Sequence, residues 1–323
     1  MRVKLWGVRG SLPSPLTPDL LRLQLEETLT GFEQQRRSNA SLTAIDYLNS
    51  LPPHLAGGYG GNTSCGEVTQ DKTRLLIDAG SGLRAFSDGL LKSEPEVNEF
   101  HLYFTHFHWD HLIGLPFFTP LYMPGRVVHF YAVHDDLEEN LRHLFRKPNF
   151  PVPYETIEKQ IRVHKLKPRE AVKIGGISLT PYQLDHPDPC WGARIEAGGK
   201  ALTWSVDTEC TRSTREELGL DIGLYQNSEL MVFDGQYTFD EAIEKANWGH
   251  SSGPIGIDLA LREGIKQVVF VHHDPSATDL NISMAEEQTS RYFEEIVRAR
   301  KKAGAPLSDL RWHFGREGET FDL

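Results

Sequence analysis

The sequence predicts an α/β (α+β) fold in which two β-sheets pack together and helices cover their outer faces. Apolar runs of strand length recur along the chain, and several are joined in pairs through glycine turns. Segments with the apolar spacing of helices lie between them, an arrangement typical of layered sandwiches. Since the sequence contains no fixed-period repeat and no low-complexity segment, residues 1–323 are predicted to form a single domain.

The N-terminal part begins as β-structure. "RVKLWGV" (Arg2–Val8) is predicted to be a strand, and Gly66–Gly82 a hairpin that ends in a glycine turn. Between them, residues 14–57 have helical apolar spacing followed by a glycine-rich loop. We interpret this segment as a helical insertion, because about forty residues bury little core alone. The next strand is predicted at Phe100–Thr105.

The rest of the chain alternates between the two patterns. Further strands are predicted at Val127–Val133, Ile177–Leu184, Leu230–Asp234 and Lys266–His273, with hairpins at Gly192–Asp207 and in the C-terminal "LRWHFGREGETFDL". Helices are predicted at Asp136–Phe145, Phe239–Ala246, Gly253–Glu263 and Met284–Ala303. The first of these helices belongs to a second predicted insertion, residues 134–165.

Composition narrows the class of protein. No apolar stretch reaches the roughly 18 residues of a membrane helix, and the N-terminus lacks the apolar region of a signal peptide, so we expect a soluble cytoplasmic protein. Three widely spaced cysteines argue against a disulfide framework or a thiolate zinc site. The formal charge of −11 argues against a large basic surface for nucleic acid. Small or locally held substrates are therefore expected.

The segment "THFHWDHLIGLPFF" (Thr105–Phe118) concentrates possible metal ligands directly after a predicted strand. His106 and His108 can point the same way from extended backbone, and Asp110 and His111 would lie on the following turn. Neutral imidazoles and a carboxylate suit zinc, manganese or iron. Burying four such groups without partners would be costly, so the motif predicts metal binding.

Three more candidates stand at the ends of other predicted strands. They are His186 in "YQLDHPDPCWG", Asp207 in "LTWSVDTE" and His272 in "VVFVHHDP". Taken singly, each is explained equally well by turn or cap chemistry. Their repeated placement at positions where sheet edges could meet favours a ligand role.

With these residues in place, the sequence resembles the metallo-β-lactamase superfamily, whose signature is His-x-His-x-Asp-His followed by a later His, an Asp and a final His. The resemblance spans nearly the whole chain and implies an αββα sandwich of two mixed β-sheets with a two-metal site at one edge. It implies that one metal is held by His106, His108 and His186, and the other by Asp110, His111 and His272, with Asp207 bridging them. His273 remains an alternative to His272 as the last ligand.

More specific segments resemble one branch of this superfamily. "NWGHSS" (Asn247–Ser252) is similar to the Gly-His-Ser-Thr segment of RNase Z and cyclic phosphodiesterases, which implies that His250 assists at the phosphate. "LWGVRGSLP" and "YGGNTSC" look like the opening of phosphoribosyl cyclic phosphodiesterases. The sequence departs from RNase Z at "FDGQ", where Phe233 replaces the histidine of His-Glu-Ala-Thr and Asp234 replaces its acid. A carboxylate that could orient His250 is thus retained.

The resemblance implies a binuclear metal-dependent phosphodiesterase that hydrolyses a small, cyclic phosphodiester such as a cyclic nucleotide or cyclic ribose phosphate. Two divalent ions, zinc in the first place with manganese or iron as alternatives, would supply a hydroxide that attacks phosphorus. His250, oriented by Asp234, would protonate the leaving alkoxide, and Asp110 would also steer the hydroxide. Residues 135–170 carry nearly balanced charge where RNase Z presents an arm for transfer RNA, so extended nucleic-acid binding is not expected.

Several alternatives remain open on sequence grounds. An RNase Z-like ribonuclease, a lactone, thioester or β-lactam hydrolase, and a non-catalytic nucleotide-binding module would all share the fold. The two insertions could cover the site and select substrate, or mediate a homodimer. Asp78 is expected to support the metal loop through hydrogen bonds. Asn62 and Thr63 fit turn chemistry as well as a site role, and Trp109, Phe117 and Phe118 are expected in the core or pocket wall.

Overall fold

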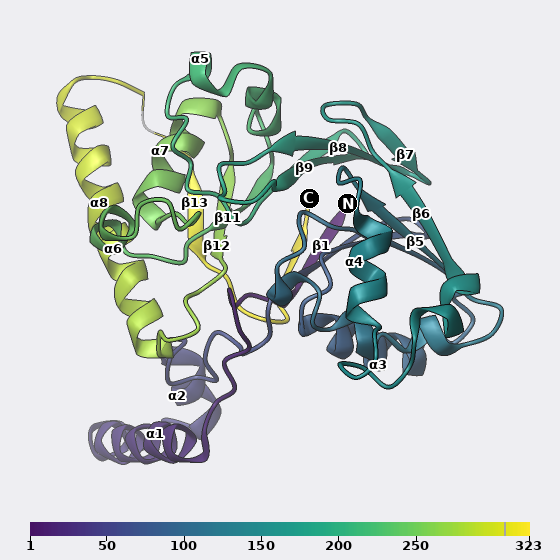
Figure 1. Ribbon diagram of the computed structural model, residues 1–323. Helices are drawn as coiled ribbons and strands as arrows, with labels where there is room; N and C mark the ends of the chain where they lie inside the picture. Colours follow the sequence, from purple (N-terminus) through teal and green to yellow (C-terminus); the bar gives the residue numbers. More distant parts are fainter. Residues whose placement is uncertain (307) are drawn as a thin grey trace.

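In the computed structural model, which describes residues 1–306 and 308–323, the strands form two seven-stranded sheets (Figure 1). The first sheet contains, in spatial order, β14 (Thr320–Asp322), β1 (Arg2–Gly7), β2 (Cys65–Gln70), β3 (Thr73–Ile77), β4 (Glu99–Tyr103), β5 (Val127–Ala132) and β6 (Ile161–Lys165). The second contains β13 (Arg311–Phe314), β12 (Gln267–Val271), β11 (Leu230–Asp234), β10 (Lys200–Ser205), β9 (Trp191–Ala197), β8 (Ile177–Gln183) and β7 (Val172–Ile174). Both sheets are mixed, which confirms the predicted fold class.

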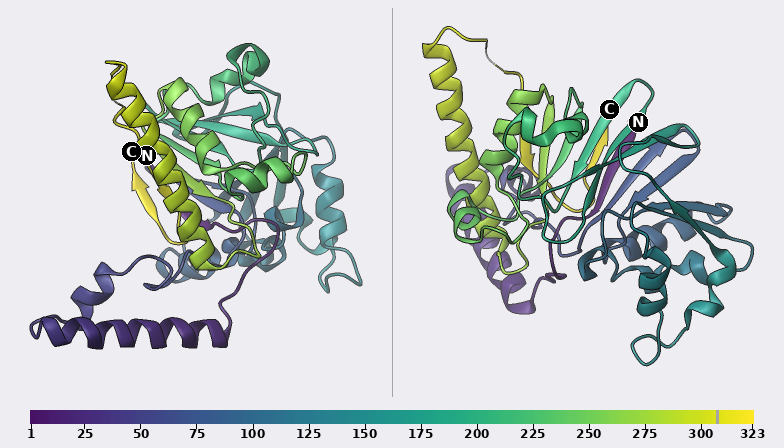
Figure 2. Two further views of the ribbon diagram at one scale, coloured as in Figure 1. Left: turned by 90° about the vertical axis from the view of Figure 1, so that its left-hand side faces the viewer. Right: turned by 45° about the horizontal axis from the view of Figure 1, so that its top comes forward.

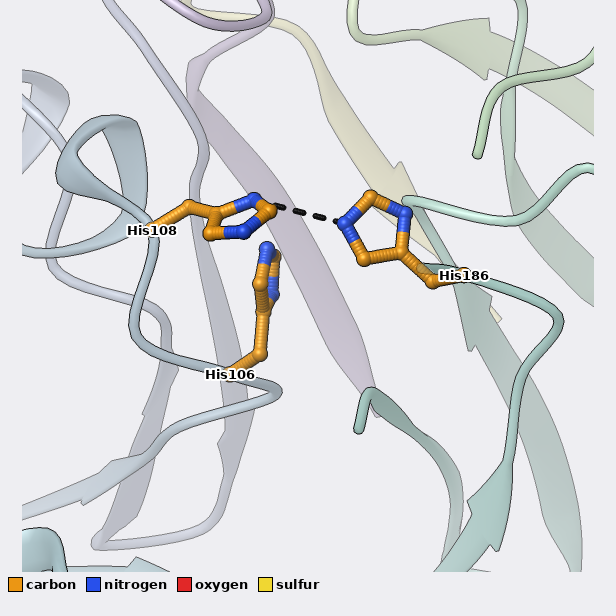
Figure 3. Close-up of side chains that lie close together, drawn as sticks. All are labelled: His106, His108 and His186. Carbon is orange, nitrogen blue, oxygen red and sulfur yellow. Dashed lines mark hydrogen bonds between the residues drawn. The ribbon is translucent and has the colours of Figure 1, made fainter. Parts of the chain in front are cut away.

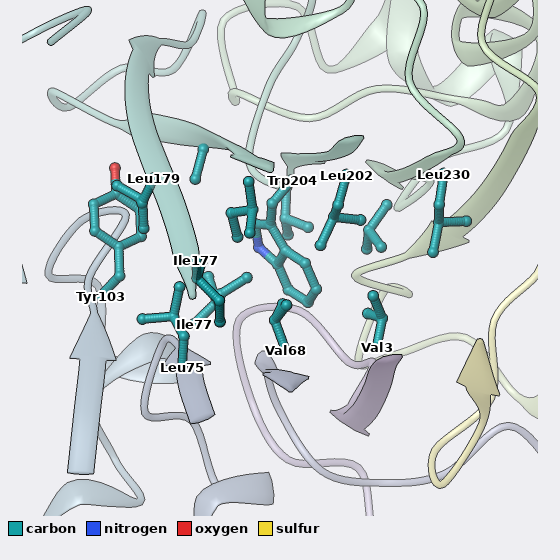
Figure 4. Packing of buried hydrophobic residues seen from close by; sticks show 14 of the residues in the cluster. Val3, Val68, Leu75, Ile77, Tyr103, Ile177, Leu179, Leu202, Trp204 and Leu230 are labelled. Carbon is teal, nitrogen blue, oxygen red and sulfur yellow. The ribbon is translucent and has the colours of Figure 1, made fainter. Parts of the chain in front are cut away.

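The core between the sheets follows from the two-residue period of the strands. Residues on the inner faces of both sheets are fully buried against each other, with Trp204 of β10 at the centre (Figure 4). In β4, Tyr103 faces this inner core, whereas Leu102 faces the helices outside. Alternation of this kind fixes the register, since a slip of one residue would exchange the two faces.

Helices cover the outer faces. The outer face of the first sheet packs against α3 (Gly82–Ser93), α4 (Leu137–Leu144) and the short turns that follow the histidine-rich motif. The second sheet is covered by α7 (Gly253–Glu263) and α8 (Asp279–Lys302), as Figure 2 also shows. Shorter helices α5 (Arg215–Leu218) and α6 (Phe239–Glu244) lie in the connections. In the structure, the helix predicted at Met284–Ala303 is α8, which begins five residues earlier, at Asp279.

The segment predicted as the first insertion forms α1 (Pro18–Ser38) and α2 (Ala44–Ser50), which project from the sandwich (Figures 1 and 2). No residue of α1 is buried, and its leucines Leu21, Leu25 and Leu29 are exposed. The second segment, residues 134–165, contains α4 but ends in strand β6 rather than in a helix. β6 escapes sequence analysis because it is an edge strand whose only fully buried residue is Ile161.

The predicted C-terminal hairpin is wrong. β13 pairs with β12 in the second sheet, whereas β14 pairs with β1 in the first. The connection crosses between the sheets because its backbone is held by both: Gly315 N donates to Phe270 O, and Gly318 N donates to Leu5 O. Two short strands joined by a glycine-containing turn look alike in sequence whether they pair with each other or with different neighbours.

Candidate metal centre

Strand direction explains why the candidate residues meet. β8 and β10 each pair antiparallel with β9, while β10, β11 and β12 pair in parallel, so β8, β10, β11 and β12 all run the same way. Their C-terminal ends therefore share one edge of the second sheet. His186 follows β8, Asp207 follows β10, Asp234 ends β11 and His272 follows β12. The motif after β4 approaches this edge from the first sheet.

The motif changes from extended chain to a tight turn. His108 has extended backbone angles, φ −63° and ψ 153°. Immediately after it, Trp109–His111 forms one 3₁₀ turn, closed by a hydrogen bond from His111 N to His108 O of 3.0 Å. This change of direction lets His106 and His108 supply one group of donors and Asp110 and His111 another.

The first group consists of His106, His108 and His186, which come from the two sheets and point toward one another (Figure 3). One ring nitrogen of each lies within 4.8 Å of one ring nitrogen of each of the others. His186 Nε2 is 3.3 Å from His108 Nδ1. Three imidazoles converging in this way would supply three of the four ligands of a tetrahedral ion or three of the six of an octahedral one.

The second group consists of Asp110, His111 and His272, which are all buried. Asp110 Oδ2 lies 3.2 Å from His111 Nε2 and 3.6 Å from His272 Nε2. Asp207 stands between the groups: its Oδ2 is 3.0 Å from His111 Nε2, and its Oδ1 is 4.0 Å from His106 Nε2. The structure thus brings together all seven residues predicted as ligands.

The donor set fits divalent metal ions. Within the described part of the chain, His106 Nε2, His111 Nε2 and Asp207 Oδ2 are buried and none makes a well-aligned hydrogen bond, although the last two atoms lie 3.0 Å apart. Burying polar atoms without partners costs on the order of 1–3 kcal/mol each. The three donor atoms lie close together. Mixed imidazole and carboxylate donors of this kind suit zinc, manganese or iron. Coordination would therefore satisfy atoms that the fold leaves unpaired.

Carboxylates raise the pKa of two histidines in the second donor group. Burial disfavours the charged form of His111, but neighbouring carboxylates, Asp110 first among them, raise the pKa of His111 well above its usual value. Burial likewise opposes protonation of His272, yet Asp207 and other carboxylates raise its pKa to about 9. Concentrated negative charge of this kind is neutralised either by protons or by bound cations.

Three residues of the centre adopt the left-handed conformation, which is unfavourable for residues other than glycine. The φ angles are 60° for Asp78, 64° for Asp207 and 66° for His272. Such backbone costs about 1–3 kcal/mol per residue and persists where the surrounding structure holds it in place. Each occurs just after a strand, where it turns the side chain into the centre.

Asp78 holds the metal loop as the sequence predicted. Its Oδ1 accepts hydrogen bonds from Thr105 N and Thr105 Oγ1 at 2.9 and 3.0 Å. Its Oδ2 lies 2.8 Å from His111 Nδ1. This contact directs His111 Nε2 toward Asp110 and Asp207, which is the role that carboxylates commonly play behind ligating histidines.

Other supporting contacts were missed by sequence reasoning. His108 Nε2 lies 2.9 Å from Asp188 Oδ2, His186 Nδ1 lies 3.1 Å from Gly249 O, and Asp110 Oδ2 accepts a hydrogen bond from Ser11 N at 2.8 Å. Only Asp188 had a signal in the sequence, because it lies two residues after His186 in "DHPDP". Ser11 and Gly249 contribute backbone atoms, which every residue type carries, so the sequence does not identify them.

His250 lies beside the centre and is held by Asp234. The distance from His250 Nδ1 to Asp234 Oδ2 is 2.9 Å, and Asp234 is completely buried. The His250 ring stacks on the His272 ring, with centroids 5.1 Å apart. The pairing anticipated from "FDGQ" and "NWGHSS" is therefore present, although Phe233 is part of the hydrophobic core.

His273 points away from the centre. Its Nε2 lies 2.9 Å from Gly315 O, and its ring stacks on Phe314 with centroids 5.8 Å apart and planes at 8°. His272, and not His273, lies with Asp110 and His111. The open choice between the two histidines is thus decided by side-chain direction.

Neighbouring polar and aromatic residues fall outside the donor groups. Asn62 Oδ1 and Thr63 Oγ1 each accept a hydrogen bond from Ser81, so turn chemistry accounts for both. Phe118 is buried as expected. Trp109 and Phe117 are 66% and 57% exposed, so neither lies in the core, and Trp109 instead lines a surface cavity beside Phe107. The 3₁₀ turn that buries Asp110 and His111 leaves Trp109 on the outside.

Comparison with known proteins places this centre in a family. Residues 73–273, more than half of the chain, match the model of the beta-lactamase superfamily domain. The chain belongs to the metallo-β-lactamase superfamily. The matched segment runs from β3 to His273. It therefore contains the six residues of the two donor groups together with Asp207.

Similar proteins include one named as a ribonuclease Z and solved structures of a diphosphatase and of PqqB. Ribonuclease Z of Staphylococcus carnosus (strain TM300) is 26% identical over 167 residues, which are 49% of this chain and 50% of that protein. The chain thus spans half the length of this relative. Zinc-bound PqqB of Methylobacterium extorquens superposes with a TM-score of 0.61 at 17% identity over 100% of both chains. A diphosphatase of the PhnP family superposes with a TM-score of 0.59 at 17% identity, covering 100% of this chain and 97% of the other.

The metallo-β-lactamase superfamily assignment confirms the resemblance inferred from the motifs. The chain has a metallo-β-lactamase fold, which implies divalent metal ions, and its donor groups converge as such ions require. The structural similarities, at these low identities, concern the fold alone. No helix in residues 1–306 or 308–323 is both long and apolar enough to cross a membrane.

Proposed function

We propose that the protein is a binuclear metal-dependent phosphodiesterase that hydrolyses small, cyclic phosphodiesters such as cyclic nucleotides or cyclic ribose phosphates. The observation that carries this proposal is His250, which comes from the Gly-His-Ser segment and is held beside the metal centre by Asp234 at 2.9 Å. In the proposed reaction this imidazole would supply the proton that the leaving alkoxide needs.

We assign the ligands as two sets around a shared carboxylate. His106, His108 and His186 would hold one ion, Asp110, His111 and His272 the other, and Asp207 would bridge them. Two divalent ions, with zinc expected and manganese or iron as alternatives, supply Lewis acidity that acidifies water and neutralises charge on the phosphate.

Side chains of the protein would orient the attacking water and protonate the leaving oxygen. Asp110, whose Oδ2 is fixed by Ser11 N, would orient the attacking water opposite the leaving oxygen. His250 Nδ1–H would donate a hydrogen bond to the Asp234 carboxylate, so that Nε2–H faces the substrate and delivers its proton to the leaving alkoxide. Because the Asp234 carboxylate is completely buried, it holds the imidazole in one orientation throughout turnover.

The preference for a small substrate rests on charge. The formal charge is −11, and the first segment that projects from the sandwich, α1, exposes leucines rather than a basic face. A long polyanion would bind such a surface weakly. Trp109, inside the histidine-rich motif, and Trp248, two residues before His250, are 66% and 64% exposed. Exposed indole rings can stack on a nucleobase, which favours cyclic nucleotides within the proposed class.

RNase Z-like processing of transfer RNA is the second candidate, because a curated relative with that name matches half of the chain. Activity assays on protein loaded with zinc, manganese or iron distinguish the phosphodiesterase from the RNase Z-like ribonuclease. We expect hydrolysis of bis-p-nitrophenyl phosphate and of cyclic nucleotides or cyclic ribose phosphates, and no cleavage of precursor transfer RNA. Efficient cleavage of the precursor alone would replace the proposal by the ribonuclease.

The same preparation tests the remaining alternatives. Turnover of nitrocefin, thioesters or lactones without turnover of diesters would assign a carbon-centred hydrolase. Tight nucleotide binding without any turnover would assign a binding module. A homodimer remains a prediction, which sedimentation equilibrium of the purified protein would test.

A further inference from the structure

A second group of metal-type donors lies on the first sheet, away from the centre described above. Glu99 and His101 belong to β4, and His129 belongs to β5. In the parallel register His101 stands directly opposite His129. At about 3.3 Å per residue, His101 lies on the order of 15 Å before His106 along the chain direction, so the two groups are separate.

The donor atoms of this group are spaced as ligands of one ion. Glu99 Oε1 lies 3.1 Å from His129 Nε2 and 3.7 Å from His101 Nε2. One donor atom from each residue lies within 4.8 Å of the other two. Ligands of a tetrahedral zinc ion stand roughly 3.4 Å apart, because each is about 2.1 Å from the metal. The measured separations lie on either side of that value.

The opposite nitrogen of each ring is held by a further side chain. His101 Nδ1 lies 3.0 Å from the hydroxyl of Tyr131, and His129 Nδ1 lies 2.8 Å from His164 Nε2 on β6. The Tyr131 and His164 rings are themselves stacked, with centroids 4.6 Å apart. Partners on Nδ1 fix the ring orientation and leave Nε2 for the metal, which is the usual arrangement behind ligating histidines.

An ion must also be able to reach the donor atoms from solvent. The side chains of His101 and His129 remain 17% and 19% exposed, and that of Glu99 is 62% exposed, so an ion can enter. The neighbouring cation Arg162 donates from Nη1 to Lys159 O and Ile161 O, which directs its charge to backbone carbonyls.

We propose that Glu99, His101 and His129 form a second binding site for a divalent transition-metal ion, of the zinc class, with solvent completing its coordination. Tyr131 and His164 are positioning residues for the two imidazoles. The ion would join β4 to β5 near the start of both strands, and His164 would extend the connection to β6. This site is independent of the proposed catalytic reaction.

The test uses the full-length protein and zinc chloride alone. Crystals soaked in zinc are measured at the zinc absorption edge, and equilibrium dialysis gives the number of bound ions. We expect an anomalous peak among Glu99, His101 and His129, and one fewer bound ion for His129→Gln than for the wild type. Hydrolytic activity should be unchanged. His143→Gln, at an exposed histidine of α4, is the matched control and should retain every ion.

Two further variants address folding and position. Glu99→Gln changes a mostly exposed side chain and should fold normally while losing the anomalous peak. Tyr131→Phe should weaken zinc binding at this site roughly 10- to 100-fold, since it removes only the partner of His101 Nδ1. The absence of a peak in the wild type, or a peak and ion count that survive both His129→Gln and Glu99→Gln, would overturn the proposal.

Discussion

The Nδ1 atom of His250 lies 2.9 Å from the Oδ2 atom of Asp234, a completely buried carboxylate at the end of β11. The same carboxylate accepts hydrogen bonds from the backbone N–H groups of Asp207, Gln236 and Ser251. Asp234 thus holds both Asp207, which lies between the two donor groups, and the imidazole beside them. One contact network therefore connects the proposed metal ligands with the proposed proton donor.

Replacing His250 by alanine should slow diester hydrolysis strongly without removing metal. A positioned general acid contributes roughly 10²- to 10⁴-fold, so kcat should fall by about that factor. Steady-state kinetics and elemental analysis measure the two effects on the same sample. His54→Ala, in the projecting segment, should leave both unchanged. Turnover at the wild-type rate in the His250 variant would remove the proton-transfer assignment.

Asp234→Asn should lower kcat while KM and metal content stay near their wild-type values. Asparagine keeps the size of the side chain, but its amide would present N–H groups to His250 and Asp207 N, which are themselves donors. We expect a loss of roughly 10²-fold in kcat. Asp240→Asn, at an exposed position of α6, is the matched control. A rise in KM with unchanged kcat would instead indicate a role in substrate binding.

Asp78→Asn should weaken metal binding. The substitution replaces the carboxylate that faces His111 Nδ1, and losing such a partner typically costs about 10- to 100-fold in metal affinity. Competition with a chromophoric chelator gives the affinity directly. Asp71→Asn is a close control, because Asp71 also has a positive φ, 54°, but lies exposed in the β2–β3 turn. Equal affinity in the two variants would contradict the supporting role of Asp78.

His272→Gln and His273→Gln form a matched pair. The first should lose one metal equivalent and hydrolytic activity, because His272 faces Asp110 and Asp207. The second should keep both metals but unfold at lower temperature, because His273 is buried with its Nε2 beside Gly315 O. Elemental analysis and thermal unfolding distinguish the two outcomes. Loss of metal in the His273 variant alone would reverse the assignment.

Asp221→Asn should destabilise the segment that carries His186, and the effect should depend on pH. Burial opposes ionisation of Asp221, but hydrogen bonds from Arg169 and Arg212 outweigh it and lower the pKa of its carboxyl. Asp221 Oδ1 also accepts from Gln183 N at the end of β8. We expect a loss of about 2 kcal/mol in unfolding free energy at pH 7, allowing for the partly exposed arginines.

The sign of the pH dependence follows from the lowered pKa. The contribution of Asp221 is complete above the unfolded-state pKa of about 3.9 and is lost as the pH falls through the lower folded-state value. Urea unfolding should therefore give a constant difference between wild type and variant from about pH 7 to pH 5. The difference should shrink only below about pH 4. A gap that narrows near pH 6 would point to another group.

Sequence reasoning located the metal centre because strand ends are visible in a sequence. His186, Asp207 and His272 each follow an apolar run, and chain direction at a sheet edge is enough to place such residues together. His250 could be chosen from its Gly-His-Ser context, and Asp234 because it matches the acid of the His-Glu-Ala-Thr segment. Backbone contributors such as Ser11 N could not be found in this way, since any residue carries an N–H group.

Other features depended on pairing between distant strands. Nothing in the sequence connects Glu99 with His129, which come together only because β4 and β5 pair in parallel in one particular register. Nothing distinguishes a C-terminal hairpin from two strands that join different sheets until the partners β12 and β1 are known.

The sequence by itself determined the fold class, the approximate strands and the residue types of the metal centre, because hydrophobic period and strand-end chemistry are local properties. The tertiary structure alone decided that His272 rather than His273 faces the centre, that Asp188 supports His108, and that Trp109 is exposed. These outcomes depend on which way a side chain points. Direction is set by register and by packing against chain segments that are remote in sequence.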